Sequence, residues 1–214
     1  MSAPLLLVAG GESSRMGEPK GLLDFHGEPW MEVQLRKFRE CGGQDAVVVL
    51  GYRAAEYFKR LPWLQGAFKG TEQIQGLLVK PALNEVPKHG PFSSIQAGIR
   101  ALLDRRDGAY ILPVDVPMPS PEVFHALEAA RSRAAGSVDV QIPTHADRGG
   151  HPVWLSEEIL DHILTVRPSS RLARLDRQIS LLPPERVQRV VVDDPGVLFN
   201  FNTPEQYRDY LLSH

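Results

Sequence analysis

Residues 5–21 have the sequence LLLVAGGESSRMGEPKG, in which a short apolar run passes directly into a glycine-rich loop. An apolar run of this length is typical of a buried strand in a parallel sheet. Open α/β sheets bind ligands at the loops that follow the carboxyl ends of their strands. Glycines let such a loop approach a ligand and turn its amides toward phosphate oxygens. The stretch therefore predicts an α/β fold whose first loop binds phosphate, with Arg15 and Lys20 suited to a polyphosphate.

Two better-known phosphate-binding motifs do not fit this loop. A P-loop needs Gly-Lys-Ser/Thr, whereas Lys20 comes three residues after Gly17 and precedes Gly21. A dinucleotide fingerprint needs G-x-G-x-x-G running into a helix, and this loop lacks that spacing. The alternative to phosphate binding is a mobile glycine loop with solvated basic side chains.

The remaining chain alternates short apolar runs with helical patterns, which predicts crossover connections and a mainly parallel sheet with helices on both faces. Strands are predicted at residues 5–9, 46–50, 77–79, 109–112, 138–142, 153–155 and 187–192. Helices are predicted at 30–39, 54–61, 91–103, 121–130, 157–166 and 169–179, with a last one opening at 203–205. Residues 66–76 are glycine-spaced and polar, which predicts a surface loop. We expect one domain over residues 1–214, a three-layer αβα nucleotide-binding fold.

Composition limits the function classes. The 214 residues are 43% hydrophobic, carry a formal net charge of −2 and include one cysteine, Cys41. One cysteine forms neither an internal disulfide nor a thiolate zinc site, so we expect a reducing, cytoplasmic setting. The near-neutral charge argues against nucleic-acid and anionic-membrane partners. No basic residue precedes the first apolar run, and that run is far below the ~20 residues of a membrane span.

The string AGGESSRMGEPKGLL, residues 9–23, resembles the signature of the molybdenum-cofactor nucleotidyltransferases, within the glycosyltransferase-A-like NTP transferases. The resemblance implies transfer of a nucleoside monophosphate from an NTP to the phosphate of molybdopterin, with release of pyrophosphate. It implies a nucleotide-binding part over about residues 1–120 and an acceptor-binding part over about 136–205. Molybdoenzymes or their chaperones are the protein partners that it suggests, and the oligomeric state stays open.

The segment VDVPMP, residues 114–119, resembles the Asp-x-Pro segment of that family, which implies that Asp115 binds Mg²⁺. Magnesium usually takes one or two protein carboxylates together with phosphates and waters. The alternative is a carboxylate that caps the turn before the next helix.

Three more segments extend the resemblance: GPFSS at 90–94, GGHPV at 149–153 and NFNTPE at 200–205. Each has a structural alternative, namely a capped helix start, a histidine that fixes a turn, and asparagine turns before a helix capped by Thr203. The resemblance implies catalytic roles for Arg15, Lys20 and Asp115 and nucleotide binding by Ala9, Gly10, Gly11, Arg15, Lys20, Gly90 and Ser94. It implies acceptor binding by His151, Asn200 and Asn202, and metal binding by Asp115 and Asn202, the latter through water.

The base of the nucleotide is less well defined. Ala9-Gly10-Gly11 and Asn200-x-Asn202 resemble guanylyltransferases, whereas the segments at 50–53, 93–98 and 150–152 resemble the cytidylyl branch. Because the loop that meets the base should count most, GTP is favoured and CTP is the alternative. Two other functions stay open: a nucleotidyltransferase for a sugar phosphate or phosphorylated alcohol, and a non-catalytic nucleotide-binding protein.

Overall fold

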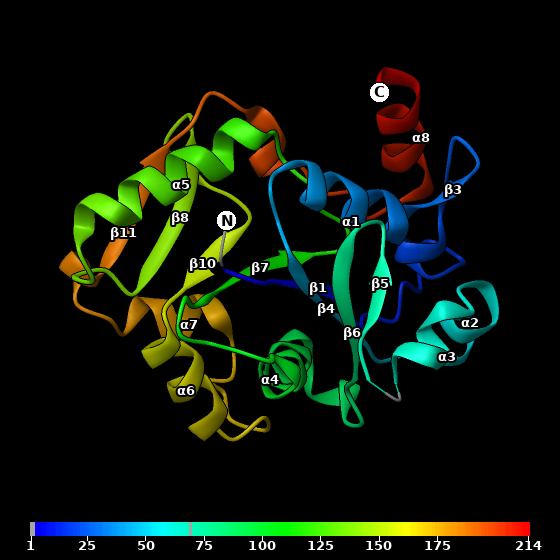
Figure 1. Ribbon diagram of the computed structural model, residues 1–214, viewed down its shortest axis with the longest axis horizontal. Coiled ribbons are helices and arrows are strands. Elements are labelled where there is room, and N and C mark those ends of the chain that lie inside the picture. Colours follow the sequence, from blue (N-terminus) through cyan, green and yellow to red (C-terminus); the bar gives the residue numbers. More distant parts are fainter. Residues whose placement is uncertain (1–2, 69) are drawn as a thin grey trace.

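The computed structural model describes residues 3–68 and 70–214 (Figure 1). In these ranges one sheet has the strand order β11-β8-β10-β7-β1-β4-β6-β5, and β9 pairs with β8. Its strands are β1 (Leu5–Ala9), β4 (Asp45–Leu50), β5 (Glu72–Ile74), β6 (Leu77–Leu83), β7 (Ala109–Pro113), β8 (Val140–His145), β9 (Arg148–Gly149), β10 (Val153–Leu155) and β11 (Val187–Val191). A separate small hairpin consists of β2 (Asp24–Phe25) and β3 (Glu28–Pro29).

The helices are α1 (Trp30–Glu40), α2 (Ala54–Arg60), α3 (Trp63–Ala67), α4 (Pro91–Ala101), α5 (Pro121–Ala134), α6 (Glu157–Thr165), α7 (Leu175–Ser180) and α8 (Pro204–Ser213). No helix in the described ranges is long and apolar enough to cross a membrane.

The centre of the sheet is parallel. Strands β7, β1, β4 and β6 run in the same direction, so their carboxyl ends meet at one edge. Strand β10 lies antiparallel between β7 and β8, which makes the whole sheet mixed. The loops that follow β1, β4, β6 and β7 therefore lie together at one edge, where open α/β sheets bind ligands.

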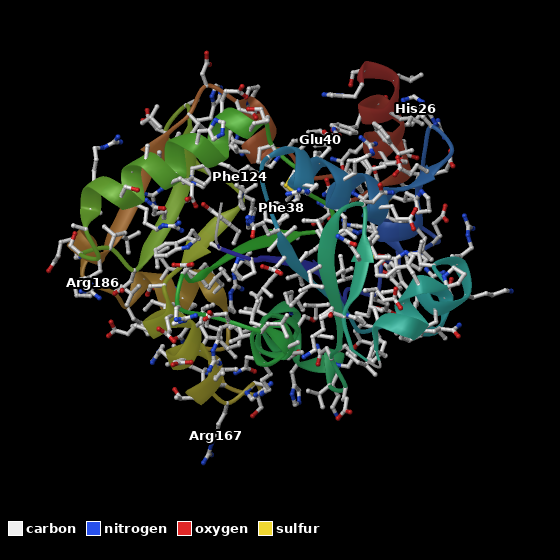
Figure 2. The ribbon with its side chains drawn as sticks, viewed as in Figure 1. His26, Phe38, Glu40, Phe124, Arg167 and Arg186 are labelled. Atoms are coloured by element: carbon white, nitrogen blue, oxygen red, sulfur yellow. The ribbon has the colours of Figure 1, made fainter. Side chains whose placement is uncertain are left out.

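Three layers follow from the alternation of side chains along buried strands. In β1, Leu5 and Leu7 join the core on one face, while Leu6 joins the core on the other. Helices α1, α5 and α8 cover the first face, and α4, α6 and α7 cover the second (Figure 1). Phe38 of α1 and Phe124 of α5 pack edge to face, with ring centroids 5.8 Å apart (Figure 2). The predicted three-layer α/β fold with a mainly parallel sheet is confirmed.

Several predicted elements differ from the structure in their bounds, among them the following three. The prediction of a loop over residues 66–76 was wrong in part, because β5 in this segment pairs antiparallel with β6. Strand β6 ends at Leu83, four residues beyond the predicted end at residue 79, and therefore includes Pro81. Since β5 pairs only with Leu77–Val79, β6 has an open side at Pro81, where a missing N–H is tolerated. Helix α7 begins only at Leu175, so the helix predicted from residue 169 was too long.

Candidate active site

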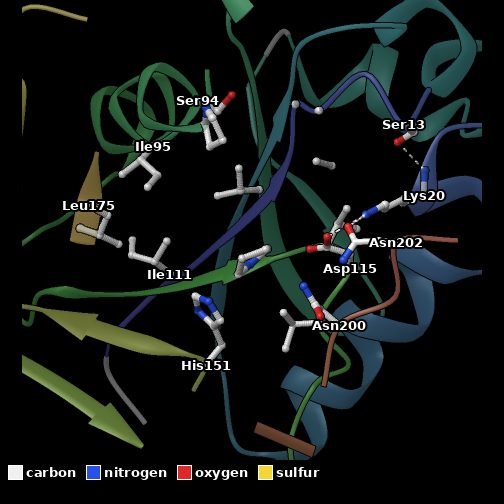
Figure 3. Close-up of a pocket in the computed structure, with 18 of the residues that line it drawn as sticks. Ser13, Lys20, Ser94, Ile95, Ile111, Asp115, His151, Leu175, Asn200 and Asn202 are labelled. Carbon is white, nitrogen blue, oxygen red and sulfur yellow. Dashed lines mark hydrogen bonds and ion pairs between the residues drawn. The ribbon is translucent and has the colours of Figure 1, made fainter. Parts of the chain in front are cut away.

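A cavity of about 850 Å³ opens at the carboxyl edge of the central strands. Every site residue predicted from the sequence lines it: Ala9, Gly10, Gly11, Arg15, Lys20, Gly90, Ser94, Asp115, His151, Asn200 and Asn202. Figure 3 shows Ser94 and Ile95 on one wall and Lys20, Asp115 and Asn202 at the opposite end. The fold thus brings residues from five separate segments to one cavity, while their individual roles remain predictions.

The glycine loop is held close to β4 and α4. The amide of Tyr52 donates to the Gly10 carbonyl across 3.2 Å. A Cβ on Gly10 would lie 2.5 Å from Ser94 Oγ, and one on Gly51 would lie 2.6 Å from the Gly10 carbonyl oxygen. Only glycine therefore fits at either position without displacing a neighbour. This close packing places the Ser94 hydroxyl directly against the start of the loop.

Lys20 donates hydrogen bonds to both predicted metal ligands, Asp115 and Asn202. Its Nζ donates to Asp115 Oδ2 across 2.7 Å and to Asn202 Oδ1 across 3.0 Å (Figure 3). The lysine backbone is fixed from two sides, because its own amide donates to Ser13 Oγ and the next amide, of Gly21, donates to Tyr57 Oη. The Tyr57 ring is buried, and burial raises the pKa of its hydroxyl, so the group stays neutral. The loop thus holds the ammonium group at the cavity end.

Asp115 and Asn202 converge from distant parts of the chain. Asp115 follows β7, and its carbonyl accepts a hydrogen bond of 3.0 Å from the amide of Phe201. The Phe201 ring is fully buried and anchors the segment that carries Asn202. Thr203 then starts α8 with a capping box, whose Gln206 side chain accepts from the Asn202 amide. The asparagine segment is therefore packed and capped.

The oxygen donors at this end suit Mg²⁺. In the described part of the chain, no three His, Cys, Asp or Glu residues cluster as a metal site. A cation here would have Asp115 as its carboxylate and the amide oxygen of Asn202 beside it, with the rest supplied by phosphates and water. That is the donor set typical of Mg²⁺, which dehydrates reluctantly and takes few protein ligands.

Arg15 differs from Lys20 in its surroundings. Its side chain is exposed at the cavity mouth, and the described residues contribute no ion pair to it. A guanidinium at such a position has its full set of donors available to an anionic ligand.

His151 lies at the wall opposite the glycine loop. Its amide donates to the Val197 carbonyl across 2.9 Å, and Gly150 packs so closely on that carbonyl that a Cβ would overlap it. Burial lowers the pKa of the imidazole, although the Ile111 backbone and the charge of Asp115 act in the opposite direction. Its Nδ1 atom is buried with no partner in the described residues. The ring is therefore neutral at pH 7 with an unused polar atom.

A second cavity of about 930 Å³ adjoins the first. The two share Pro91, Ile95, Gly149, Gly150, His151 and Leu175. Apolar side chains from α4, α7 and the strands line it, with Arg174, Asp176 and Arg189 among the polar ones. The residues just before α7, which were predicted to be helical, line this cavity with Ala173 and Arg174.

Sequence reasoning missed several residues around the site. Arg148 lines the first cavity and directly precedes the quoted Gly149-Gly150, so it lay within reach of that motif. Asn84 follows the carboxyl end of β6, and this position was a usable signal. Tyr57 sits in the middle of a helix with nothing in its local pattern to indicate contact with the loop.

Comparison with known proteins gives the family of the chain. Residues 5–183 match the family described as MobA-like NTP transferase domain. The chain belongs to this family. It is 30% identical over 206 residues to a probable molybdenum cofactor guanylyltransferase of Opitutus terrae, covering 93% of this chain and 90% of that protein. This family membership makes the chain a nucleotidyltransferase.

Solved structures share the fold. Rv0371c of Mycobacterium tuberculosis superposes with a TM-score of 0.73 at 19% identity, covering 100% of both chains. Molybdopterin-guanine dinucleotide biosynthesis protein A of Archaeoglobus fulgidus gives 0.64 at 20% identity, covering 98% of this chain and 97% of that one. The MobA-like fold described above thus extends over nearly the whole chain.

Proposed function

We propose that this MobA-like nucleotidyltransferase transfers a nucleoside monophosphate from an NTP to the phosphate of molybdopterin and releases pyrophosphate. The observation that carries the proposal is the cluster of Lys20, Asp115 and Asn202 at one end of a glycine-lined cavity. A cationic donor beside one carboxylate and one amide oxygen suits a triphosphate with its magnesium ion. Bound there, Mg²⁺ would neutralise charge on the transferred phosphate and on the pyrophosphate.

The chain's own residues would position the reactants. Arg15 and Lys20 bind the triphosphate, and the Gly10-Gly11 backbone approaches the nucleoside, helped by Gly90 and Ser94 at the start of α4. An acceptor phosphate is already anionic, so the reaction needs no general base, and catalysis depends on alignment and charge neutralisation. His151 lines both the first cavity and the one beside it, which supports its assignment to the acceptor side.

We assign the acceptor to the second cavity. It adjoins the first at His151 and Leu175, so an acceptor bound there would lie next to the cavity proposed for the nucleotide. Its apolar lining suits a flat ring system, and Arg189 supplies a cation for an anionic group, whereas Arg174 is paired with Asp176. Residues 136–205 supply most of its lining, which supports the proposed division into a nucleotide part, residues 1–120, and an acceptor part.

GTP is the proposed nucleotide, and CTP is the alternative. The support for GTP is the Ala9-Gly10-Gly11 loop together with the guanylyltransferase relative reported above.

Pyrophosphate release with each of the four NTPs and Mg²⁺, with and without molybdopterin, tests the proposal. We expect release with GTP that requires molybdopterin. Asp115→Ala should abolish turnover, whereas Asp209→Ala, which removes an exposed carboxylate on α8, should leave turnover unchanged. Pyrophosphate release that requires a hexose 1-phosphate instead of molybdopterin would overturn the proposed acceptor. If no combination of NTP and acceptor releases pyrophosphate, the proposed reaction is wrong.

A further inference from the structure

Asn84 is a buried polar residue next to the nucleotide cavity that none of the roles above includes. It follows the carboxyl end of β6, at the same sheet edge as the glycine loop, and only 3% of it is exposed. Its backbone N–H donates to the Leu50 carbonyl across 2.8 Å, which fixes the backbone next to the end of β4. A buried side-chain amide must satisfy its own hydrogen bonds, so its orientation is determined by its neighbours.

The orientation of the Asn84 amide follows from one contact. The backbone N–H of Val86 donates to Oδ1 across 3.0 Å, and because an N–H only donates, this atom must be the oxygen. The Nδ2 atom therefore faces the other way. Its two protons go to Ser93 Oγ at 2.8 Å and to Ser94 Oγ at 2.9 Å. Both hydroxyl oxygens are thus acceptors from Asn84.

The two serines differ in where their own protons go. Ser93 Oγ donates to the Gly90 carbonyl across 2.7 Å, so its proton is used within the protein, and its side chain does not line the nucleotide cavity. Ser94 does line that cavity, and no described residue accepts its proton. Asn84 occupies one side of the Ser94 oxygen and Gly10 packs against another. The Ser94 hydroxyl proton is therefore left to donate to a ligand in the cavity.

We propose that Asn84 is a positioning residue that makes Ser94 a hydrogen-bond donor to an acceptor atom on the nucleotide base. The inference rests on the proposed nucleotide binding and adds how the base is selected. Ser94 lies on the wall opposite Lys20 and Asp115, the end assigned to the phosphates, so the base is the part of the nucleotide nearest to it (Figure 3). A site built to donate at one point rejects a base with a donor there, because two donors would face each other without a partner.

The matched serines provide the first test, by calorimetric titration of each of the four NTPs with Mg²⁺. Ser94→Ala should weaken the preferred NTP about five- to tenfold, the worth of one neutral hydrogen bond, and weaken the other NTPs less. Ser93→Ala removes an equally buried hydroxyl from the same asparagine and should change affinity less than about twofold. Equal losses in the two variants would overturn the inference, as would an equal loss for all four NTPs.

Asn84→Asp tests the positioning role itself. A carboxylate accepts rather than donates, so both serine protons would turn toward it and the Ser94 lone pairs would face the nucleotide. Affinity should fall at least as much as in Ser94→Ala, and the double variant should bind within about twofold of Ser94→Ala alone, since Asn84 acts through Ser94. Additive losses would refute this. Should Asn84→Asp unfold, the serine pair still decides, and a wild-type protein that binds no NTP contradicts the proposed function instead.

Discussion

Replacing Lys20 with methionine should have opposite effects on the binding of metal and of nucleotide. The ammonium group now lies 2.7 Å from Asp115 Oδ2 and 3.0 Å from Asn202 Oδ1, the two oxygens that suit a magnesium ion. Without nucleotide, lysine and cation therefore compete for the same oxygens. With nucleotide, the lysine has phosphates to bind, and its removal takes away a positive charge that the triphosphate needs.

The size of the first effect follows from the distances. A cation that binds Asp115 while the ammonium stays would have a charge of +2 about 4 Å from a charge of +1, which costs about 2 kcal/mol even at the dielectric constant of water. Lys20 and Asp115 are only 13% and 21% exposed, so this value is a lower bound. A cost of about 2 kcal/mol corresponds to about thirtyfold in affinity. We therefore expect Lys20→Met to bind a divalent cation at least about thirtyfold more tightly in the absence of nucleotide.

Titration with Mn²⁺, followed by the relaxation of water protons, measures this binding without any turnover. Lys59→Met is the matched control, because it removes the same charge from an exposed position on α2 and should leave Mn²⁺ affinity unchanged. The same Lys20→Met variant should bind Mg²⁺-GTP more weakly than wild type. Unchanged or weaker Mn²⁺ affinity in Lys20→Met would refute the competition and, with it, the assignment of the cation to Asp115.

Two further predictions concern stability. Burial lowers the pKa of His151 below its unfolded value of about 6.5, so below that pH the unfolded chain binds more protons and the free energy of unfolding falls. Urea unfolding at pH 7.5 and 5.5 should show a larger loss for wild type than for His151→Asn, while the exposed His125→Asn should follow wild type. Phe201→Ala should cost about 3–5 kcal/mol of unfolding free energy, because the ring is fully buried against Trp30 and Tyr207. Leu212→Ala, at a position 80% exposed on α8, should change the unfolding free energy by less than about 0.5 kcal/mol in the same denaturant series. Equal costs for the two variants would contradict the anchoring role of Phe201.

The sequence predicted those parts of the fold that local pattern determines. The strand at β1 was found because a short apolar run passes into a glycine loop, and the helix at α1 because a helical pattern ends just before Gly42 and Gly43. Strand β5 was missed because it has only three residues and only one of them, Ile74, is a large hydrophobic residue. Its existence depends on pairing with β6, a long-range contact that single-sequence periodicity does not carry.

In the site, too, local sequence patterns were predicted and long-range contacts were not. Lys20 and Asp115 were identified because each lies in a segment whose residue order resembles a family signature. Their direct ion pair was not predicted, since 95 residues separate them and the contact arises only when β1 and β7 lie side by side. Asn84 was missed because it follows an ordinary strand and resembles no motif, and its importance comes from two hydroxyls on another element.

Helix α4 connects the two cavities. Ser94 faces the nucleotide cavity only, Phe92 faces the second cavity only, and Ile95 lies on the wall that both share. Positions 92 and 95 are three residues apart and so lie on one face of the helix, whereas Ser94 points toward Gly10. One rigid helix thus carries the group proposed to read the base and part of the surface proposed to hold the acceptor. A substitution that tilts α4 should therefore weaken both substrates together, whereas one that only changes Ser94 should affect the nucleotide alone.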